Sequence, residues 1–125
     1  MIQLDTNFVI ATLEPTTAEA RATRRWLNAG RRLGVSAPAW AEFLCGPLSA
    51  TDRLTAAQLL GSPVPFGVRD AELAAELFNV GGRRRRTLVD CMIAAVAIVH
   101  GADLATANTA DFARFAVRGL RLTAP

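Results

Sequence analysis

Four acidic residues of the types that bind metal ions stand where a short apolar run gives way to a helix-like segment. They are Asp5, Glu42, Asp90 and Asp111. Carboxylates brought together repel one another strongly unless cations neutralise them. Oxygen ligands without an accompanying set of histidines or cysteines favour a hard cation, Mg²⁺ or Mn²⁺, over zinc. A Mg²⁺ ion that keeps open positions is suited to phosphate-ester chemistry.

Each of these acids also has a purely structural explanation. Asp5 would cap a following helix, and Glu42, the one charge in AWAEFLCG, would face solvent on a partly exposed helix. Asp90 is the only acid in LVDCMIAAVAIVHG, and Thr87 stands three residues before it, as in a capping box. Asp111 in TANTADF would cap a short helix. The joint placement of the four is more informative than any one position.

The positions of the acids depend on an alternation of strands and helices. Strands are expected at Ile2 to Asp5, at Leu33 to Ala37, within GSPVPFG, at ADLAT and at LRL. Thr16 and Glu19 have the spacing of a capping box that opens a helix reaching Gly30, and Thr51 is expected to cap DRLTAAQLL. Further helices are expected at TNFVIATLE, PAWAEFLCG, RDAELAAELF, from Thr87 to Gly101 and at NTADFARF.

This alternation predicts a single α/β domain over residues 1–125, with a mainly parallel sheet of four to five strands covered on both faces. Strand-to-helix junctions of such a sheet meet at one edge, beyond the carboxyl ends of the strands, where ligand sites form. The four acids are therefore expected to converge.

The basic residues narrow the possible functions. All 14 are arginine, the formal net charge is +3 and the pI is about 10.1, which weakly favours a polyanionic partner. A phosphoacceptor receiver domain is disfavoured because it needs a lysine after its last strand. A haloacid-dehalogenase-like phosphatase is disfavoured because Thr6 and Asn7, rather than an x-Asp pair, follow Asp5. The run Arg83, Arg84, Arg85 and Arg86 is either a solvated loop, a grip on RNA phosphates or a contact for an acidic partner.

Other features predict an intracellular protein without further catalytic groups. Cys45 and Cys91 lie in apolar surroundings and are expected to be reduced and buried. The start MIQLD shows no signal peptide, and the apolar run from Cys91 to Val99 is too short to span a membrane, so a cytoplasmic location is expected. His100 would lie at a helix C-terminus and is given no catalytic role. The tryptophans and phenylalanines are expected to pack the core or an interface.

Four segments in order, LDTNFVI, WAEFLCG, LVDCMIAAVAIVHGADLATAN and TADF, resemble a PIN-domain ribonuclease of the VapC toxin group over essentially the whole chain. The resemblance implies a three-layer α/β/α sandwich and Mg²⁺-dependent cleavage of RNA. It matches Asp5, Glu42, Asp90 and Asp111 with the four metal-binding acids of the family. It also matches Thr6, Asn7, Thr106 and Asn108 with polar positions that orient the acids, a metal-bound water or the scissile phosphate.

The resemblance implies a mechanism without a protein nucleophile. Mg²⁺, or Mn²⁺ in its place, would be held mainly by Asp5 and Asp90 and would activate a water, with Glu42 and Asp111 holding a second metal or its waters. The products would carry 5′-phosphate and 3′-hydroxyl ends. The resemblance further implies a homodimer that is silenced by an antitoxin protein. A non-toxin PIN-domain RNA-processing nuclease and a catalytically silent PIN-like RNA-binding subunit are the alternatives.

Overall fold

The computed structural model describes residues 1–125 and is built around a four-stranded parallel sheet. Its strands are β1 (Ile2–Leu4), β2 (Leu33–Gly34), β3 (Asp103–Ala105) and β4 (Arg121–Thr123), in the spatial order β2-β1-β3-β4. In the central strand, Ile2 pairs with Leu33 on one side and with Asp103 on the other. All three strand pairs are parallel, as the alternating sequence pattern predicted.

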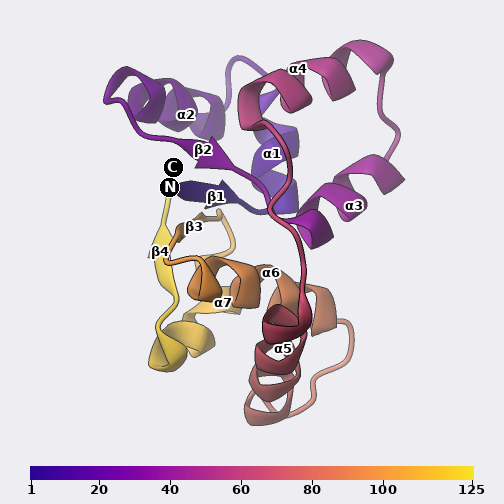
Figure 1. Ribbon diagram of the computed structural model, residues 1–125. Coiled ribbons are helices and arrows are strands. Elements are labelled where there is room, and N and C mark those ends of the chain that lie inside the picture. The colour runs from indigo at the N-terminus through magenta and orange to yellow at the C-terminus, as the bar shows by residue number, and fades with distance from the viewer.

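Seven α-helices and one 3₁₀-helix connect the strands and cover the sheet. The helices are α1 (Thr6–Thr12), α2 (Ala18–Asn28), α3 (Ala37–Cys45), α4 (Ala50–Leu60), α5 (Val68–Val80), α6 (Leu88–Val99), α7 (Thr109–Phe112) and the 3₁₀-helix η1 (Ala113–Arg118). Figure 1 shows α1, α2 and α4 on one side of the sheet and α5, α6 and α7 on the other. Helix α3 contacts both α1 and α6. This arrangement confirms the predicted three-layer α/β/α architecture.

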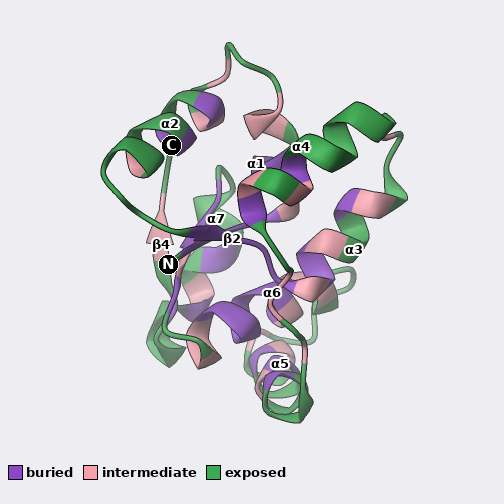
Figure 2. Cartoon of the chain, turned by 45° about the horizontal axis from the view of Figure 1, so that its top comes forward, coloured by how far each residue is buried: buried purple, intermediate pink, exposed green.

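Helix α6 is the buried helix of the domain. Its buried side chains are small or aliphatic, and they are Cys91, Ile93, Ala94, Ala95, Val96 and Ala97. Small side chains let the helix lie close to the sheet, and interiors packed in this way leave little void space. In Figure 2 the buried colour is concentrated in α6 and the strands, whereas α4 and the outer face of α5 are largely exposed. The aromatic residues pack as expected, with the Phe8 and Trp26 rings stacked at 5.6 Å.

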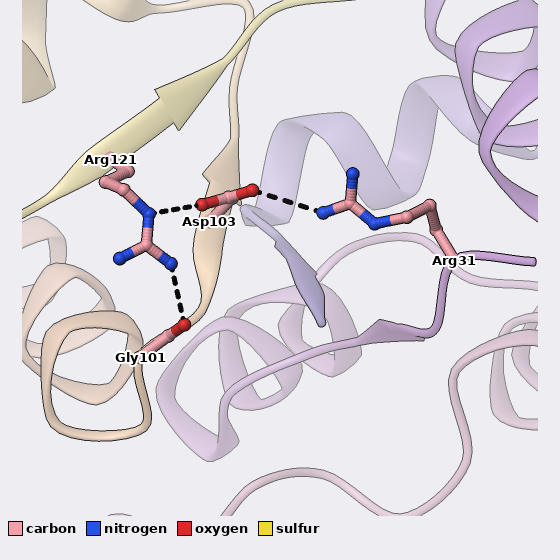
Figure 3. A network of polar contacts seen from close by, with 4 residues as sticks. All are labelled: Arg31, Gly101, Asp103 and Arg121. Carbon is pink, nitrogen blue, oxygen red and sulfur yellow. Dashed lines mark hydrogen bonds and ion pairs between the residues drawn. The ribbon is translucent and has the colours of Figure 1, made fainter.

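An ion-pair network joins β3, β4 and the segment before β2 at the edge where these strands begin. Asp103, the first residue of β3, accepts hydrogen bonds from Arg121 Nε at 2.7 Å and from Arg31 Nη2 at 3.2 Å (Figure 3). Arg121 also donates to the Gly101 carbonyl at 2.8 Å. Partial burial opposes ionisation of Asp103, but the two arginines outweigh it and lower the pKa of its carboxyl. The network stabilises the edge opposite to the one where the four acids lie.

Two helix caps differ from their predicted positions. Helix α2 is capped by Thr17 rather than by Thr16, because the Thr17 hydroxyl both accepts from the Ala20 amide at 3.0 Å and donates to the Ala11 carbonyl at 2.6 Å. Helix α4 begins two residues earlier than expected. Its cap is Ser49, which accepts from the Asp52 amide at 3.0 Å, and Thr51 lies inside the first turn.

The segment Gly61 to Gly67 forms a single parallel bridge, between Val64 and Ser36, instead of a full third strand. Pro63 and Pro65 flank Val64 and carry no amide hydrogen, so the ladder cannot extend on either side. Strand β2 is correspondingly shorter than predicted, because Ser36 already caps α3 by accepting from the Ala39 amide.

Both cysteines are free, but only one is buried as predicted. Cys91 is buried on α6, whereas Cys45 is exposed because it ends α3 on the solvent side. None of the helices combines the length and apolarity that crossing a membrane requires.

Candidate active site

Asp5 lies at the junction between the central strand and α1, and it is almost fully buried at 5% exposure. Its Oδ1 atom accepts a hydrogen bond from the Phe8 amide at 2.8 Å, so Asp5 caps the N-terminus of α1 as its structural explanation predicted. The cap does not explain the burial of the charge. Desolvation raises the pKa of Asp5 despite hydrogen bonding by the Thr106 side chain and the Phe8 amide, and the charges of Glu42 and Glu19 raise it further.

Glu42 is held beside the start of α1 from a different helix. The Thr6 hydroxyl, one residue after Asp5, donates to Glu42 Oε1 at 2.6 Å and also lies 3.4 Å from the Ala39 carbonyl. Glu42 is exposed on α3, as expected if it simply faced solvent on a partly exposed helix. It is nevertheless fixed toward the acid junction, because its hydrogen-bond donor is the residue next to Asp5.

The capping explanation for Asp90 fails in the structure. The Thr87 hydroxyl donates to the Arg84 carbonyl at 2.6 Å, and no side chain caps α6. Asp90 therefore stands half-buried in the first turn of α6 without the reciprocal bond of a capping box. Burial raises the pKa of its carboxyl, the charges of Glu42, Asp111 and Asp5 raise it further, and that of Arg114 opposes them. The carboxylates predicted to converge thus act on one another electrostatically.

The fourth junction follows β3 and carries Thr106, Asn108 and Asp111. Thr106 is fully buried, and its hydroxyl accepts from the Asn108 amide at 2.9 Å, which shapes the turn into α7. Asp111 is exposed in the first turn of α7 and makes no side-chain cap, although its charge acts on Asp90. Asn7 is exposed in α1, and its side chain makes no hydrogen bond to the four acids.

The arginine run forms an exposed turn between α5 and α6. Arg83 and Arg86 have positive φ angles of 54° and 63°, a conformation that side-chain-bearing residues seldom adopt. Arg83 Nε donates to Asn79 at 3.1 Å, and the run ends at Arg86, one residue before the helix that carries Asp90. The turn therefore places four exposed arginines directly before the helix that carries Asp90.

Two charged residues at the junction were not predicted from the sequence to belong to the site. Glu19, interpreted as part of a helix cap, contributes negative charge near Asp5. Arg114 contributes positive charge near Asp90. A signal for Arg114 existed, because residues three apart on a helical turn lie on the same side and Arg114 follows Asp111 at that spacing. No comparable signal marked Glu19.

The donor set at the junction fits a hard divalent cation. Its side chains present carboxylate and hydroxyl oxygens, and His100 lies at the far end of α6. A cation would offset the repulsion that raises the pKa values of Asp5 and Asp90. In their present positions no three acidic, histidine or cysteine side chains are grouped so that they could hold a metal ion. Coordination therefore requires the carboxylates to turn toward a shared centre.

The fold and the site place the protein in the class of α/β/α domains that carry acidic residues at the carboxyl edge of a parallel sheet. The chain matches the model of the PIN domain over residues 2–118, and it belongs to the PIN domain family. No curated protein matches the sequence.

Solved structures share the fold over the whole chain. VapBC2 from Rickettsia felis, bound to a DNA fragment from their promoter, matches with a TM-score of 0.76 and 20% identity, covering 100% of this chain and 99% of that chain. VapBC-1 from nontypeable Haemophilus influenzae matches with a TM-score of 0.76 and 19% identity, covering 99% and 98%. FitAcB from Neisseria gonorrhoeae matches with a TM-score of 0.71 and 23% identity, covering 98% and 96%.

Proposed function

We propose that the protein is a Mg²⁺-dependent endoribonuclease that hydrolyses phosphodiester bonds. The observation that carries the proposal is the state of Asp90, a half-buried carboxylate without its expected cap whose pKa is raised by burial and by the charges of three other acids. A site that gathers negative charge in this way is destabilising on its own. It becomes favourable when a divalent cation occupies it.

The residues of the chain have distinct tasks in this proposal. Asp5 and Asp90 hold the ion, and Glu42 and Asp111 hold a second ion or bound waters. When bound, the metal supplies a nucleophilic water at neutral pH and polarises the phosphoryl oxygen. The Thr6 hydroxyl fixes Glu42 through its 2.6 Å hydrogen bond, and Thr106 supports the Asp5 carboxylate.

RNA is the proposed substrate because an exposed run of four arginines, Arg83–Arg86, comes directly before the helix that carries Asp90. Arginine side chains of this kind bind the phosphate backbone without reading its sequence. Asn7 and Asn108 remain predicted polar contacts to the scissile phosphate or to a metal-bound water.

Cleavage of total RNA tests the proposed activity. The wild-type protein is expected to cleave in Mg²⁺ or Mn²⁺ and to stop in EDTA. Asp90→Asn should abolish cleavage while preserving the size of the side chain. Glu72→Gln, on the exposed face of α5, removes an equal charge away from the junction and should cleave like the wild type. Activity that survives both EDTA and Asp90→Asn would overturn the proposal.

We further propose that the nuclease is the toxin of a toxin–antitoxin pair. The support is the fold, which matches a chain of a toxin–antitoxin complex from Klebsiella pneumoniae and a chain of VapBC-5 from Mycobacterium tuberculosis, a member of the VapBC family of toxin–antitoxin systems. A hollow of about 330 Å³ is lined by Ile10, Leu13, Glu14, Phe43, Gly46, Pro47, Leu48 and Asp52, and by none of the four acids. It lies toward the C-terminal ends of α1 and α3, so an antitoxin segment seated there would contact the two helices that carry Thr6 and Glu42.

Expression in bacteria tests the toxin assignment. The wild-type chain should arrest growth, Asp90→Asn should not, and co-expression of a cognate antitoxin should restore growth. A chain that cleaves RNA in vitro yet is harmless when expressed alone would favour the non-toxin RNA-processing nuclease. A chain that binds RNA without cleaving it would favour the silent PIN-like subunit, although all four acids are present.

Homodimerisation and a cytoplasmic location are also part of the proposal. Analytical ultracentrifugation, which measures the mass of the particle in solution, tests homodimerisation.

A further inference from the structure

Arg114 is held firmly at the rim of the acid junction, at the start of η1. Its Nη1 atom donates to the Asp111 carbonyl at 2.8 Å, and its Cζ atom lies 4.4 Å from the centre of the Phe115 ring. On its other side it packs against the end of α5, where a Cβ atom added to Gly81 would lie only 3.3 Å from Arg114 Nε. The guanidinium is thus fixed by α5, by the Phe115 ring and by the backbone of α7.

The charge of Arg114 has no ion-pair partner within the chain. The salt bridges of the protein use Arg31, Arg118 and Arg121. The Nε atom of Arg114 is buried and lacks a hydrogen-bond partner. The Asp111 carbonyl and the Phe115 ring compensate part of the cost of burying this cation, but no carboxylate neutralises its charge. Its positive charge nevertheless reaches Asp90, where it opposes the rise in pKa that burial and the neighbouring acids cause.

The chemistry of the proposed substrate supplies what Arg114 lacks. A phosphodiester entering the junction meets the negative charge of four carboxylates, and a fixed cation beside them offsets that repulsion. The planar guanidinium matches the geometry of two phosphate oxygens, and such charge-assisted hydrogen bonds are stronger than neutral ones. By contrast, Arg83–Arg86 are exposed, and among them only the side chain of Arg83 makes a hydrogen bond, to Asn79.

We propose that Arg114 is a catalytic residue of the nuclease, which binds the non-bridging oxygens of the phosphodiester being cleaved. This inference rests on the proposed function. It adds a positively charged protein group to a site whose other predicted contacts are acids, hydroxyls and amides.

Single-turnover cleavage of one long in vitro RNA transcript at saturating Mg²⁺ tests the inference. Arg114→Ala should cleave about 100-fold more slowly, the usual effect of removing one preorganised donor to a developing charge. Arg114→Lys should recover part of the rate, and guanidinium ion at a non-denaturing concentration should partly rescue Arg114→Ala. Arg118→Ala is the matched control on the same helix, because it removes an exposed arginine paired with Glu76, and it should stay within twofold of the wild type. A rate for Arg114→Ala within threefold of the wild type would overturn the inference.

A second readout does not depend on cleavage. In EDTA, Arg114→Ala should bind a fluorescein-labelled mixed-sequence RNA of about 20 nucleotides more weakly, by about tenfold for the loss of roughly 1.4 kcal/mol. Its melting temperature should match that of Arg118→Ala. A lowered melting temperature without guanidinium rescue would assign Arg114 a purely structural role and refute the inference. If the wild type cleaves no RNA, the proposed function fails, while the binding comparison still decides whether Arg114 contacts phosphate.

Discussion

Replacing Asp5 by asparagine and by alanine separates the two tasks assigned to its carboxylate. Asparagine keeps an oxygen that can accept from the Phe8 amide, now at 2.8 Å from Oδ1, but it removes the charge. Alanine removes both the charge and the cap. The pair therefore distinguishes the local capping role of Asp5 from its proposed role as a metal ligand.

The structure fixes the expected order of stability of these variants. Without metal at neutral pH, Asp5→Asn should be more stable than the wild type, because burial disfavours the charged carboxylate and raises its pKa. Asp5→Ala should be about 1 kcal/mol less stable than Asp5→Asn, the usual cost of losing a helix cap. In Mg²⁺ at 100 times its Kd the wild type should gain about 2.7 kcal/mol. Both variants should lose most of that gain.

Thermal unfolding in EDTA and in Mg²⁺ measures all of these differences. For a domain of this size about 1 kcal/mol corresponds to roughly 4 °C in melting temperature. The reasoning is refuted if Asp5→Asn gains as much stability from Mg²⁺ as the wild type does. It is also refuted if the metal-free wild type is more stable than Asp5→Asn. Equal stability of the two variants would show that the Phe8 cap contributes nothing.

Three further predictions concern other buried or paired polar groups. Gln3 is fully buried in β1 and both polar atoms of its side chain lack partners, so Gln3→Met should raise the free energy of unfolding by about 1–3 kcal/mol in urea titrations; an unchanged or lowered value would contradict this. Because the pKa of Asp90 is raised on folding, its contribution in metal-free protein is present below its unfolded pKa and lost as pH rises through its folded pKa, so Asp90→Asn should flatten the pH dependence of unfolding in EDTA. Asp103 has a lowered pKa, so its contribution is present above its unfolded pKa and lost as pH falls through its folded pKa. Asp103→Asn should cost about 1 kcal/mol or less at neutral pH, since Arg31 and Arg121 are largely exposed; equal acid sensitivity in the variant and the wild type would exclude this role.

The parts of the fold that the sequence predicted are those specified by strong local patterns. The apolar runs at Ile2 and at Leu104, with helical segments between them, indicated parallel strands and a buried central helix, and both are present. The caps were less predictable, because Thr16 and Thr17 have equally suitable side chains. The choice was made by the Ala11 carbonyl, which lies on another helix.

The candidate site shows the same division between local pattern and tertiary context. The four acids were identified from their positions at strand-to-helix junctions. The capping box of Asp90 was a valid local alternative, and it fails because the backbone of Thr87 has φ −108° and ψ −3° instead of the extended conformation of a capping residue, so its hydroxyl makes no cap bond. Arg114 was missed although its spacing from Asp111 was a signal, because its nearness to Asp90 and its packing against Gly81 depend on tertiary structure.

The chemistry of the RNA ends tests the central claim most directly. A single RNA cleaved in Mg²⁺ by the wild-type protein, with Asp90→Asn as the control, should yield fragments with 5′-phosphate and 3′-hydroxyl termini. These ends result when an activated water, rather than the ribose 2′-hydroxyl, attacks the phosphorus. The variant should yield no fragments. Fragments that end in a 2′,3′-cyclic phosphate, or that form equally with Asp90→Asn, would contradict the account of the four carboxylates as a metal-dependent nuclease site.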